Sequence, residues 1–363
     1  MNQPCLKLTT YFGERQRAVA DADARRPGFL ADAMLELFDT RDIATSVMMR
    51  GVASFGPRHV LRTDESLSLS EDPPVAITAV DVESKISALV DDVVAMTGNG
   101  LVTLERARLV GGGDVIDNGN GDAVKLTVYV GRQERIGGLP AFRAVCDLLH
   151  RLEFSGGAAF LGVDGTANGV RYRARFFSRN VNVPMMIVAI GTAAQVSAAV
   201  AELGGTGTNA LLTVERVRVC KRGGELFSRP HRLPDVDDQG RPLWQKLVVH
   251  TSEATVYDGV PIHRALVSRL LDSGVARGAT ALRGVWGFHG DHEPHGDKLF
   301  QLTRRMPVVT IIVDTPEWIA RSFDIVDEFT AEHGLVTSEM VPAVVSISGE
   351  DRDGDGLLAR HDY

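Results

Sequence analysis

Two arginine pairs are the side chains best suited to bind an anion in this sequence of 363 residues. Arg106 and Arg108, and again Arg216 and Arg218, stand two residues apart in strand-like runs. Residues spaced in this way share one face of a strand, so each pair could hold a phosphate or a carboxylate between two guanidinium groups. A salt bridge to a glutamate of another copy, such as Glu105, is the more common use of such arginines.

Further candidate ligand-binding residues stand at the start of long polar loops and on strands. Arg50-Gly51 and Arg283-Gly284 each precede such a loop, and their glycines would allow a tight turn or the close approach of a ligand. A turn without a ligand explains these glycines equally well, and neither loop carries a Walker or dinucleotide-binding pattern. Lys7 and Lys125 lie on the more polar face of two strands that match in sequence.

Two segments suggest metal binding as an alternative. His289, His292 and His295 stand three residues apart and could bind zinc or copper, but a solvated polar loop is the commoner explanation, because one short loop rarely supplies a closed site. Residues 351–362 have the spacing of a calcium-binding loop. No helix is expected beside them, so a disordered acidic tail is favoured there.

Sequence motifs of catalysis are missing from the chain. It contains no GxSxG, HExxH or CxxC pattern, and no pairing of a nucleophile with a base can be read from the sequence. We therefore expect a protein that is not an enzyme.

Composition narrows the class of protein and its surroundings. With 44% hydrophobic residues the chain can form packed cores, and its net charge of −8 argues against nucleic acid as the main partner. The three cysteines are odd in number and lack metal-like spacing, which is typical of a reducing cytoplasm. No signal peptide and no apolar run of the ~18 residues needed for a membrane span are seen, so we expect a cytoplasmic location.

The candidate residues recur because the chain itself repeats. Leu6–Gln16 is matched by Val124–Glu134 and, more weakly, by Gln245–Thr251, at intervals of roughly 120 residues, which is the size of a small domain rather than of a solenoid unit. The sequence therefore divides into repeat 1 (5–110), a Gly-rich linker (111–122), repeat 2 (123–220), a second linker (221–242), repeat 3 (243–348) and an acidic tail (349–363).

Each repeat shows the same predicted order of elements. Alternation of apolar and polar residues predicts strands, as in 6–11 and 101–110, and apolar residues at helical spacing predict helices, as in 29–38. The resulting order, βαββαβ, is typical of the ferredoxin-like fold.

Several motifs resemble those of the PII-like family catalogued as domain of unknown function 190. In repeat 1 they are Arg50-Gly51, Phe55-Gly56, the run 67–75 and the run 100–105. Repeat 3 has counterparts in Arg283-Gly284, Gly287-Phe288, Met306–Val309 and Gly334–Thr337. The resemblance covers nearly all of the chain outside the linkers and the tail, and it is weaker in repeat 2.

The resemblance implies both a fold and a function. The expected fold is α+β, with three tandem ferredoxin-like domains that form a pseudo-trimer within a single chain. That chain is expected to be a monomer. The expected function is ligand sensing: a small anionic ligand, for which an adenine nucleotide is one candidate, would bind in clefts between repeats, and the long loops would contact a protein partner such as a transporter. Two alternatives stay open, a metal-binding protein similar to CutA and a structural interaction module without a small ligand.

Overall fold

The structure is a computed structural model that describes residues 3–19, 28–63, 72–111, 123–173, 182–289, 295–296 and 306–361. Most of the predicted Gly-rich linker (111–122) and the first part of the polar run 67–75 lie outside these residues.

Repeat 1 alternates strands with helices that bury one apolar stripe. Helix α1 buries Leu30, Met34 and Phe38, which lie four residues apart and so share one face. The elements of repeat 1 are β1 (Gln3–Gly13), α1 (Leu30–Thr40), β2 (Thr45–Phe55), β3 (Arg62–Thr63), β4 (Pro74–Val82), α2 (Glu83–Ser87), α3 (Val90–Met96) and β5 (Asn99–Leu109).

Repeat 2 follows the same plan. Its second long helix begins with a capping box, in which the side chains of Thr192 and Gln195 each accept a hydrogen bond from the other's backbone N–H. The elements are β6 (Ala123–Gly131), β7 (Arg135–Ile136), β8 (Leu139–Pro140), α4 (Ala141–Arg151), β9 (Gly156–Leu161), β10 (Thr166–Ala167), β11 (Val170–Arg171), β12 (Pro184–Gly191), α5 (Ala193–Gly204), β13 (Leu211–Arg222) and β14 (Glu225–Leu226).

Repeat 3 has additional strands at its end. Its last long helix starts with Pro316, whose fixed φ suits the first helical position. The elements are β15 (Trp244–Ser252), β16 (Val256–Tyr257), β17 (Val260–Pro261), α6 (Ile262–Ser273), β18 (Ala279–Arg283), β19 (Trp286–His289), β20 (His295–Gly296), β21 (Pro307–Asp314), α7 (Pro316–Phe329), β22 (Leu335–Val341), β23 (Ala343–Ser348) and β24 (Asp351–Asp353).

Strand pairing runs through all three repeats without a break. Within the repeats the main strands pair in the orders β5-β1-β4-β2, β13-β6-β12-β9 and β22-β15-β21-β18. Between repeats, β2 pairs with β18, β13 pairs with both β5 and β22, and β9 pairs with β19. As a result nine strands close into one antiparallel circuit: β1, β4, β2, β18, β21, β15, β22, β13 and β5.

The expected fold, three separate ferredoxin-like domains forming a pseudo-trimer, is therefore wrong. The structure is a single closed nine-stranded antiparallel sheet with additional strands, not three domains placed side by side. The physical reason is the length of the strands: β2, β5 and β13 extend past their own repeat, and their ends pair with another repeat instead of leaving open edges.

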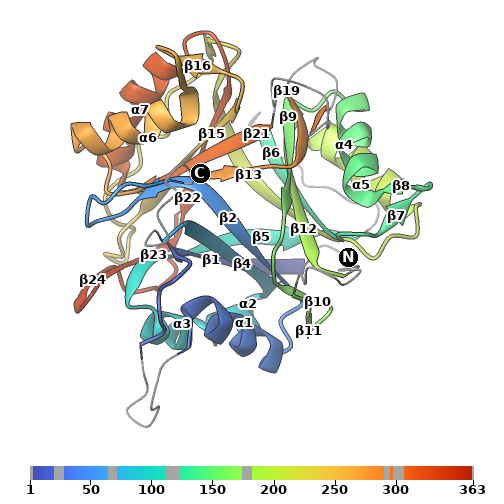
Figure 1. Ribbon diagram of the computed structural model, residues 1–363, viewed down its shortest axis with the longest axis horizontal. Coiled ribbons are helices and arrows are strands. Elements are labelled where there is room, and N and C mark those ends of the chain that lie inside the picture. Colours follow the sequence, from blue (N-terminus) through green and yellow to red (C-terminus); the bar gives the residue numbers. More distant parts are fainter. Residues whose placement is uncertain are drawn as a thin grey trace.

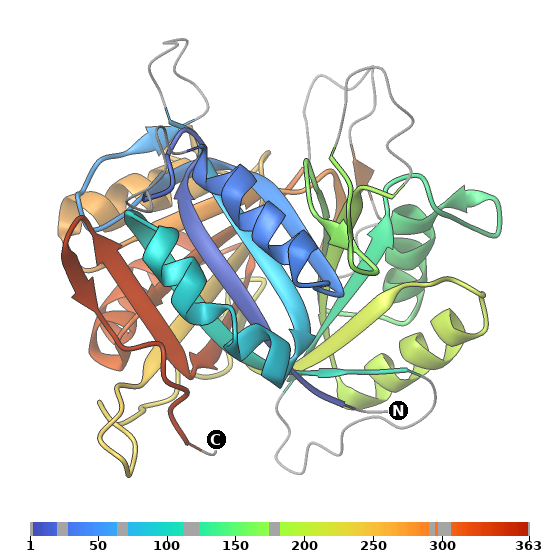
Figure 2. The same ribbon diagram turned by 90° about the horizontal axis from the view of Figure 1, so that it is seen from below.

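Helices cover the outside of this sheet and the strands converge at its centre (Figure 1). Helices α1 and α3 lie over the strands of repeat 1, as the view from below shows (Figure 2). Each repeat has a core between its own strands and helices, and a further cluster joins all three, with Met49, Phe160 and Leu282 among its members. Burial of this shared apolar surface favours the closed arrangement.

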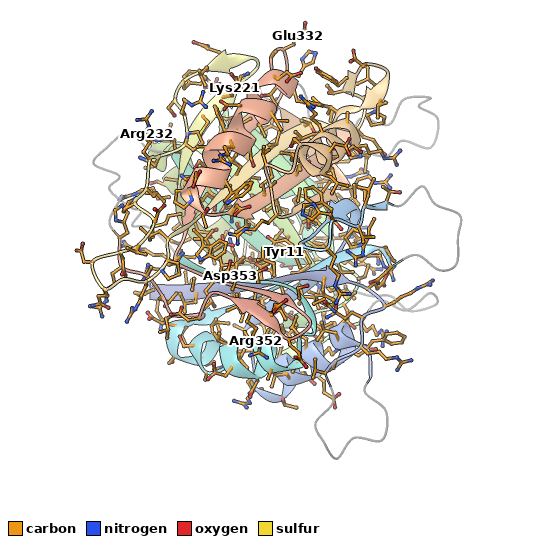
Figure 3. All side chains as sticks on the ribbon, turned by 90° about the vertical axis from the view of Figure 1, so that its left-hand side faces the viewer. Tyr11, Lys221, Arg232, Glu332, Arg352 and Asp353 are labelled. Carbon is orange, nitrogen blue, oxygen red and sulfur yellow. The ribbon has the colours of Figure 1, made fainter. Side chains whose placement is uncertain are left out.

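The C-terminal segment is ordered over its described residues, so the expectation of a disordered tail is wrong. Strand β23 pairs with β5 of repeat 1, and β24 turns back on β23, which places Arg352 and Asp353 at the surface (Figure 3). Ala359 is fully buried, and its backbone N–H donates to the carbonyl of Pro342. The end of the chain thus packs against the repeats.

Among the described residues, no helix combines the length and the apolar character that crossing a membrane would require.

Candidate functional site

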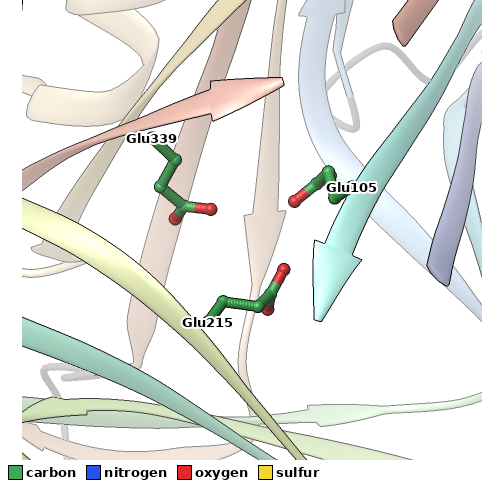
Figure 4. A group of neighbouring side chains, drawn as sticks. All are labelled: Glu105, Glu215 and Glu339. Carbon is green, nitrogen blue, oxygen red and sulfur yellow. The ribbon is translucent and has the colours of Figure 1, made fainter. Parts of the chain in front are cut away.

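A buried cluster of six charged residues lies where the repeats meet. The first strand of each repeat contributes a lysine and the last strand a glutamate, and within each repeat the two residues are register partners in paired strands. The three carboxylates point toward one another (Figure 4). We call these residues the inner charged cluster: Lys7, Lys125, Lys246, Glu105, Glu215 and Glu339.

Each lysine of the cluster contacts the glutamate of its own repeat and that of one neighbour, and Lys125 also lies 3.9 Å from Glu105 of the other neighbour. Lys7 Nζ lies 2.9 Å from Glu105 Oε2 of repeat 1 and 2.6 Å from Glu215 Oε1 of repeat 2. The remaining contacts follow the same order, Lys125 with Glu215 (3.1 Å) and Glu339, and Lys246 with Glu339 (3.0 Å) and Glu105. The ion pairs therefore connect all three repeats in a ring.

Burial and opposite charge act against each other on the pKa values of the cluster. Burial disfavours the charged form of Lys7, but the surrounding carboxylates outweigh it and raise the pKa well above its ordinary value. Burial would raise the pKa of Glu339, but the lysines, Lys125 foremost, lower it to about 2, and the pKa of Glu105 is held well below its ordinary value in the same way. At Lys125 the effect of burial is larger than that of the neighbouring carboxylates, and the pKa is lowered. Lys7, Glu105 and Glu339 therefore stay charged at neutral pH.

The three glutamates could suggest a metal site, since their carboxylate oxygens lie within 4.8 Å of one another. Three lysine ammonium groups already balance their charge, and an added cation would leave the buried cluster with excess positive charge. The donor set is therefore that of an ion-pair network rather than of a metal centre.

A cavity of about 80 Å³ adjoins the inner charged cluster. Tyr11, Tyr129 and His250, which occupy matching positions in the three first strands, line it together with cluster residues. Ile311 and Tyr11 also line a second cavity on the outer side. Tyr11 thus stands between the interior and this outer cavity.

The outer cavity is a cleft of about 110 Å³ between repeats 1 and 3, which we call the 1/3 cleft. Repeat 1 contributes Phe55, Arg58 and Arg62 from β2 and the segment after it, and repeat 3 contributes Trp244 and Arg277. Three arginines and no carboxylate are found among the described residues that line it. Arg277 is paired with Asp314 and Asp353, and Arg62 lies 3.9 Å from Asp72, but these carboxylates do not line the cleft. The cleft therefore combines aromatic surfaces with three arginines.

Arg277 is held in place from three sides. Its Nε donates to Asp314 Oδ1 at 2.8 Å, and its Nη1 donates to Asp353 Oδ2 at 2.5 Å. Its guanidinium lies 4.7 Å from the centre of the Trp244 ring, a cation–π distance. The buried Asp314 and the exposed Asp353 raise the pKa of Arg277 against the effect of burial, so it remains a cation.

Side chains occupy the corresponding places at the other two boundaries. At the boundary between repeats 2 and 1, Thr166 occupies the position that Phe55 has in repeat 1, and its Oγ1 donates to Ser46 Oγ at 3.0 Å. Between repeats 3 and 2, Phe288 is fully buried and lies so close to Gly157 that a Cβ there would meet its ring at 2.6 Å. These two boundaries are packed where the 1/3 cleft is open.

A wider groove of about 470 Å³ lies between repeats 1 and 2, but its charges pair with one another. Arg50 contacts Glu14 at 2.5 Å, and Arg173 contacts Asp32 at 3.1 Å and Asp164 at 3.5 Å. The carboxylates that pair with these arginines line the groove itself, whereas no described carboxylate lines the 1/3 cleft.

The arginine pairs predicted to bind a ligand do not line the described cavities. Arg106, Arg108 and Arg216 are exposed and Arg218 is half-buried, on the face of their strands opposite to the cluster glutamates. Arg106 Nη2 donates to the carbonyl of Ala359 at 2.8 Å. One of the four thus helps to fasten the C-terminal segment.

The two Arg-Gly motifs serve a shared structural purpose. Arg283 contacts Glu253 at 3.1 Å, matching the pair of Arg50 and Glu14 in repeat 1. A Cβ on Gly51 would lie 2.9 Å from a backbone carbonyl of repeat 3, and one on Gly284 would lie 2.9 Å from a carbonyl of repeat 2. The glycines permit close strand contact between repeats.

The other predicted site residues fall in two places. Lys7 and Lys125 belong to the inner charged cluster, where carboxylates are their partners. His289 and His295 lie on the paired strands β19 and β20, and His292 lies outside the described residues, so zinc or copper binding there stays a prediction.

Sequence reasoning missed Lys246, Arg58, Arg62, Trp244 and Arg277. Lys246 had a signal, because the three first strands all carry lysine at the same position. Arg277 had none, because the positions that match it in repeats 1 and 2 are Ala44 and Ser155.

Comparison with known proteins places the repeats in one family. The model of domain of unknown function 190 (DUF190), described as "Uncharacterized ACR", matches residues 5–109, 123–219 and 244–343. A UPF0166 protein of Aquifex aeolicus (strain VF5) is 35% identical over 106 residues, which make up 97% of that protein and 29% of this chain. No solved structure matches the chain. The family predicted from the sequence motifs is confirmed.

Proposed function

The chain belongs to the DUF190 family and holds three tandem copies of its domain, and on that basis we propose that it is a cytoplasmic, non-enzymatic sensor of a small anionic ligand. The ligand binds in the 1/3 cleft and regulates a protein partner such as a transporter. An adenine nucleotide is the first ligand to test, because it joins a planar ring to a polyanion.

The observation that carries the proposal is the lining of the 1/3 cleft by three arginines and no described carboxylate. Arginine binds phosphate and carboxylate groups through paired N–H donors, and aromatic rings stack on planar ligands. The indole Nε1 of Trp244 is buried and has no hydrogen-bond partner among the described residues, so a ligand acceptor would satisfy it.

A ligand in this cleft would contact two repeats at once. Arg58 and Arg62 belong to repeat 1 and Arg277 to repeat 3, so one anion held by all three depends on how these repeats are placed. Arg58 and Arg62 also lie on the connection between β2 and β4, which is the segment proposed to contact the partner. Ligand and partner are thereby coupled through the same stretch of chain.

One ligand per chain is expected rather than three. The boundary between repeats 2 and 1 is bridged by Thr166 and Ser46, and the boundary between repeats 3 and 2 is filled by Phe288. Of the three described cavities, the one between repeats 1 and 3 is lined by arginines and by no described carboxylate, whereas carboxylates line the other two.

A thermal-shift screen with ATP, ADP, AMP, cyclic AMP and small carboxylates tests this function, because a ligand of the folded state raises the melting temperature by mass action. We expect an adenine nucleotide to raise it in the wild type, and the double substitution Arg58→Ala/Arg62→Ala to reduce the affinity at least tenfold, since it removes charge-assisted hydrogen bonds of about 1.5–3 kcal/mol each. Chromatography of the recovered nucleotide should show it unchanged.

The matched control is Arg108→Ala/Arg216→Ala, which removes the same charge from exposed positions outside the cleft. It should bind like the wild type. Loss of binding in this control but not in the cleft variant would contradict the proposed site, and consumption of the nucleotide would contradict a role without catalysis.

A further inference from the structure

We propose that the guanidinium of Arg277 is the anion-binding subsite of the 1/3 cleft, and that Asp353 occupies it until an anionic ligand displaces it and loosens strand β24 in the C-terminal segment 349–361. This inference rests on the proposed function and adds both a subsite and a means of regulation to it.

The two carboxylates that hold Arg277 differ in how easily a ligand could replace them. The Asp314 side chain is fully buried and contacts the guanidinium at Nε and Nη2. The Asp353 side chain is 61% exposed and contacts only Nη1. An ion pair with such an exposed partner is weak, so a phosphate or carboxylate arriving in the cleft can take the place of Asp353 while Asp314 keeps the guanidinium oriented.

The segment that carries Asp353 pairs with a strand of the cleft wall. Residues Ser346–Ser348 of β23 line the cleft, and β24 pairs with the same residues of β23. Asp353 thus contacts Arg277 from strand β24, and the partner strand β23 borders the cleft in which the ligand is proposed to bind. A ligand that draws Arg277 away from Asp353 therefore removes a contact that keeps β24 against the body.

The rest of the C-terminal segment is fastened by the buried Ala359 and by side chains of the body that bind its backbone groups. Arg106 and Arg241 donate to the carbonyls of Ala359 and Leu358, and Asp237 accepts from the backbone N–H of Arg360. These contacts hold residues 358–360 against repeat 1 and the linker 221–242, so the change that follows ligand binding is centred on β24. Such a change offers a partner a surface that differs between the ligand-free and the bound protein.

The device is specific to one boundary of the molecule. Ala44 and Ser155 stand where repeat 3 has Arg277, although the backbone N–H of Ala44 donates to Asp81 just as that of Arg277 donates to Asp314. Arg277 and strand β24, which contacts it, are therefore both found at repeat 3, after which the chain continues into the C-terminal segment.

The test measures ATP binding by calorimetry and amide hydrogen exchange of residues 349–361, in the wild type and in Asp353→Asn. In the wild type, ATP should accelerate exchange in this segment. Asp353→Asn should bind ATP about two- to fivefold more tightly, because the competing carboxylate is gone, and should show accelerated exchange even without ATP. Asp351→Asn, which removes the same charge from an exposed position of the same strand, should leave both quantities unchanged.

Each outcome separates this inference from the proposed function. Binding of ATP with no change in exchange at 349–361, and with equal affinity in Asp353→Asn, would overturn the inference and leave the proposed function standing. If neither protein binds ATP or any other ligand of the screen, both are overturned.

Discussion

The inner charged cluster and the 1/3 cleft lie on opposite sides of Tyr11, and both join charged groups from different repeats. The cluster is buried, and its three lysines are matched by three glutamates. The cleft is open, and its three arginines meet no carboxylate among its described lining residues. A buried network of balanced charges can specify which strands lie side by side, whereas an open cleft lined by cations is available to a ligand.

The comparison predicts its largest effect for a substitution within the cluster. Glu105→Ala should lower the free energy of unfolding by about 3–5 kcal/mol, because Lys7 and Lys246 lose a carboxylate partner in a buried setting. Urea denaturation measures this. An equal loss in Glu317→Ala, whose side chain is exposed and paired only with Arg321, would show that burial is not the cause.

Acid should weaken the contribution of the cluster to the stability of the fold. Because the pKa of Glu339 is lowered to about 2, its contribution to stability is fully present above its unfolded-state pKa of about 4.5 and is lost as the pH falls through about 2. This difference corresponds to roughly 3 kcal/mol. Unfolding curves between pH 5 and pH 2 should therefore be less steep in pH for Glu339→Gln than for the wild type, and identical slopes would argue against the cluster as the source.

The smallest effect is expected at the edge of the cleft. Asp353→Asn should change the free energy of unfolding by less than about 1 kcal/mol, because its ion pair with Arg277 is largely exposed. The same denaturation assay measures this. A loss as large as that of Glu105→Ala would mean that the contact is a structural requirement and could not serve as a displaceable one.

The sequence allowed the local structure and the family to be predicted, but not the way in which the repeats join. Residues 29–38 were predicted to form a helix, and α1 spans Leu30–Thr40. The closed sheet could not be predicted, because alternation along β2 or β13 reveals a strand without naming the strands that pair with its end. Apolar and polar patterning describes faces, whereas closure depends on edges.

The candidate site shows the same division. Lys7 and Lys125 were predicted to lie on the more polar face of their strands, and in the structure this face turns toward the inner charged cluster, because alternation along a strand fixes the side on which a residue lies. The same alternation places Arg106 and Arg216 on the opposite face from Glu105 and Glu215, so the predicted arginine pairs point away from the inner charged cluster. Arg277 left no trace in the repeat pattern, because one repeat alone carries it.

The most direct test of the central claim is the stoichiometry of ATP binding, measured by calorimetry on the full chain. The account predicts one ATP per chain and the loss of this binding in Arg58→Ala/Arg62→Ala. Three equivalent ATP molecules per chain, or one whose binding survives that substitution, would contradict the 1/3 cleft as the ligand site.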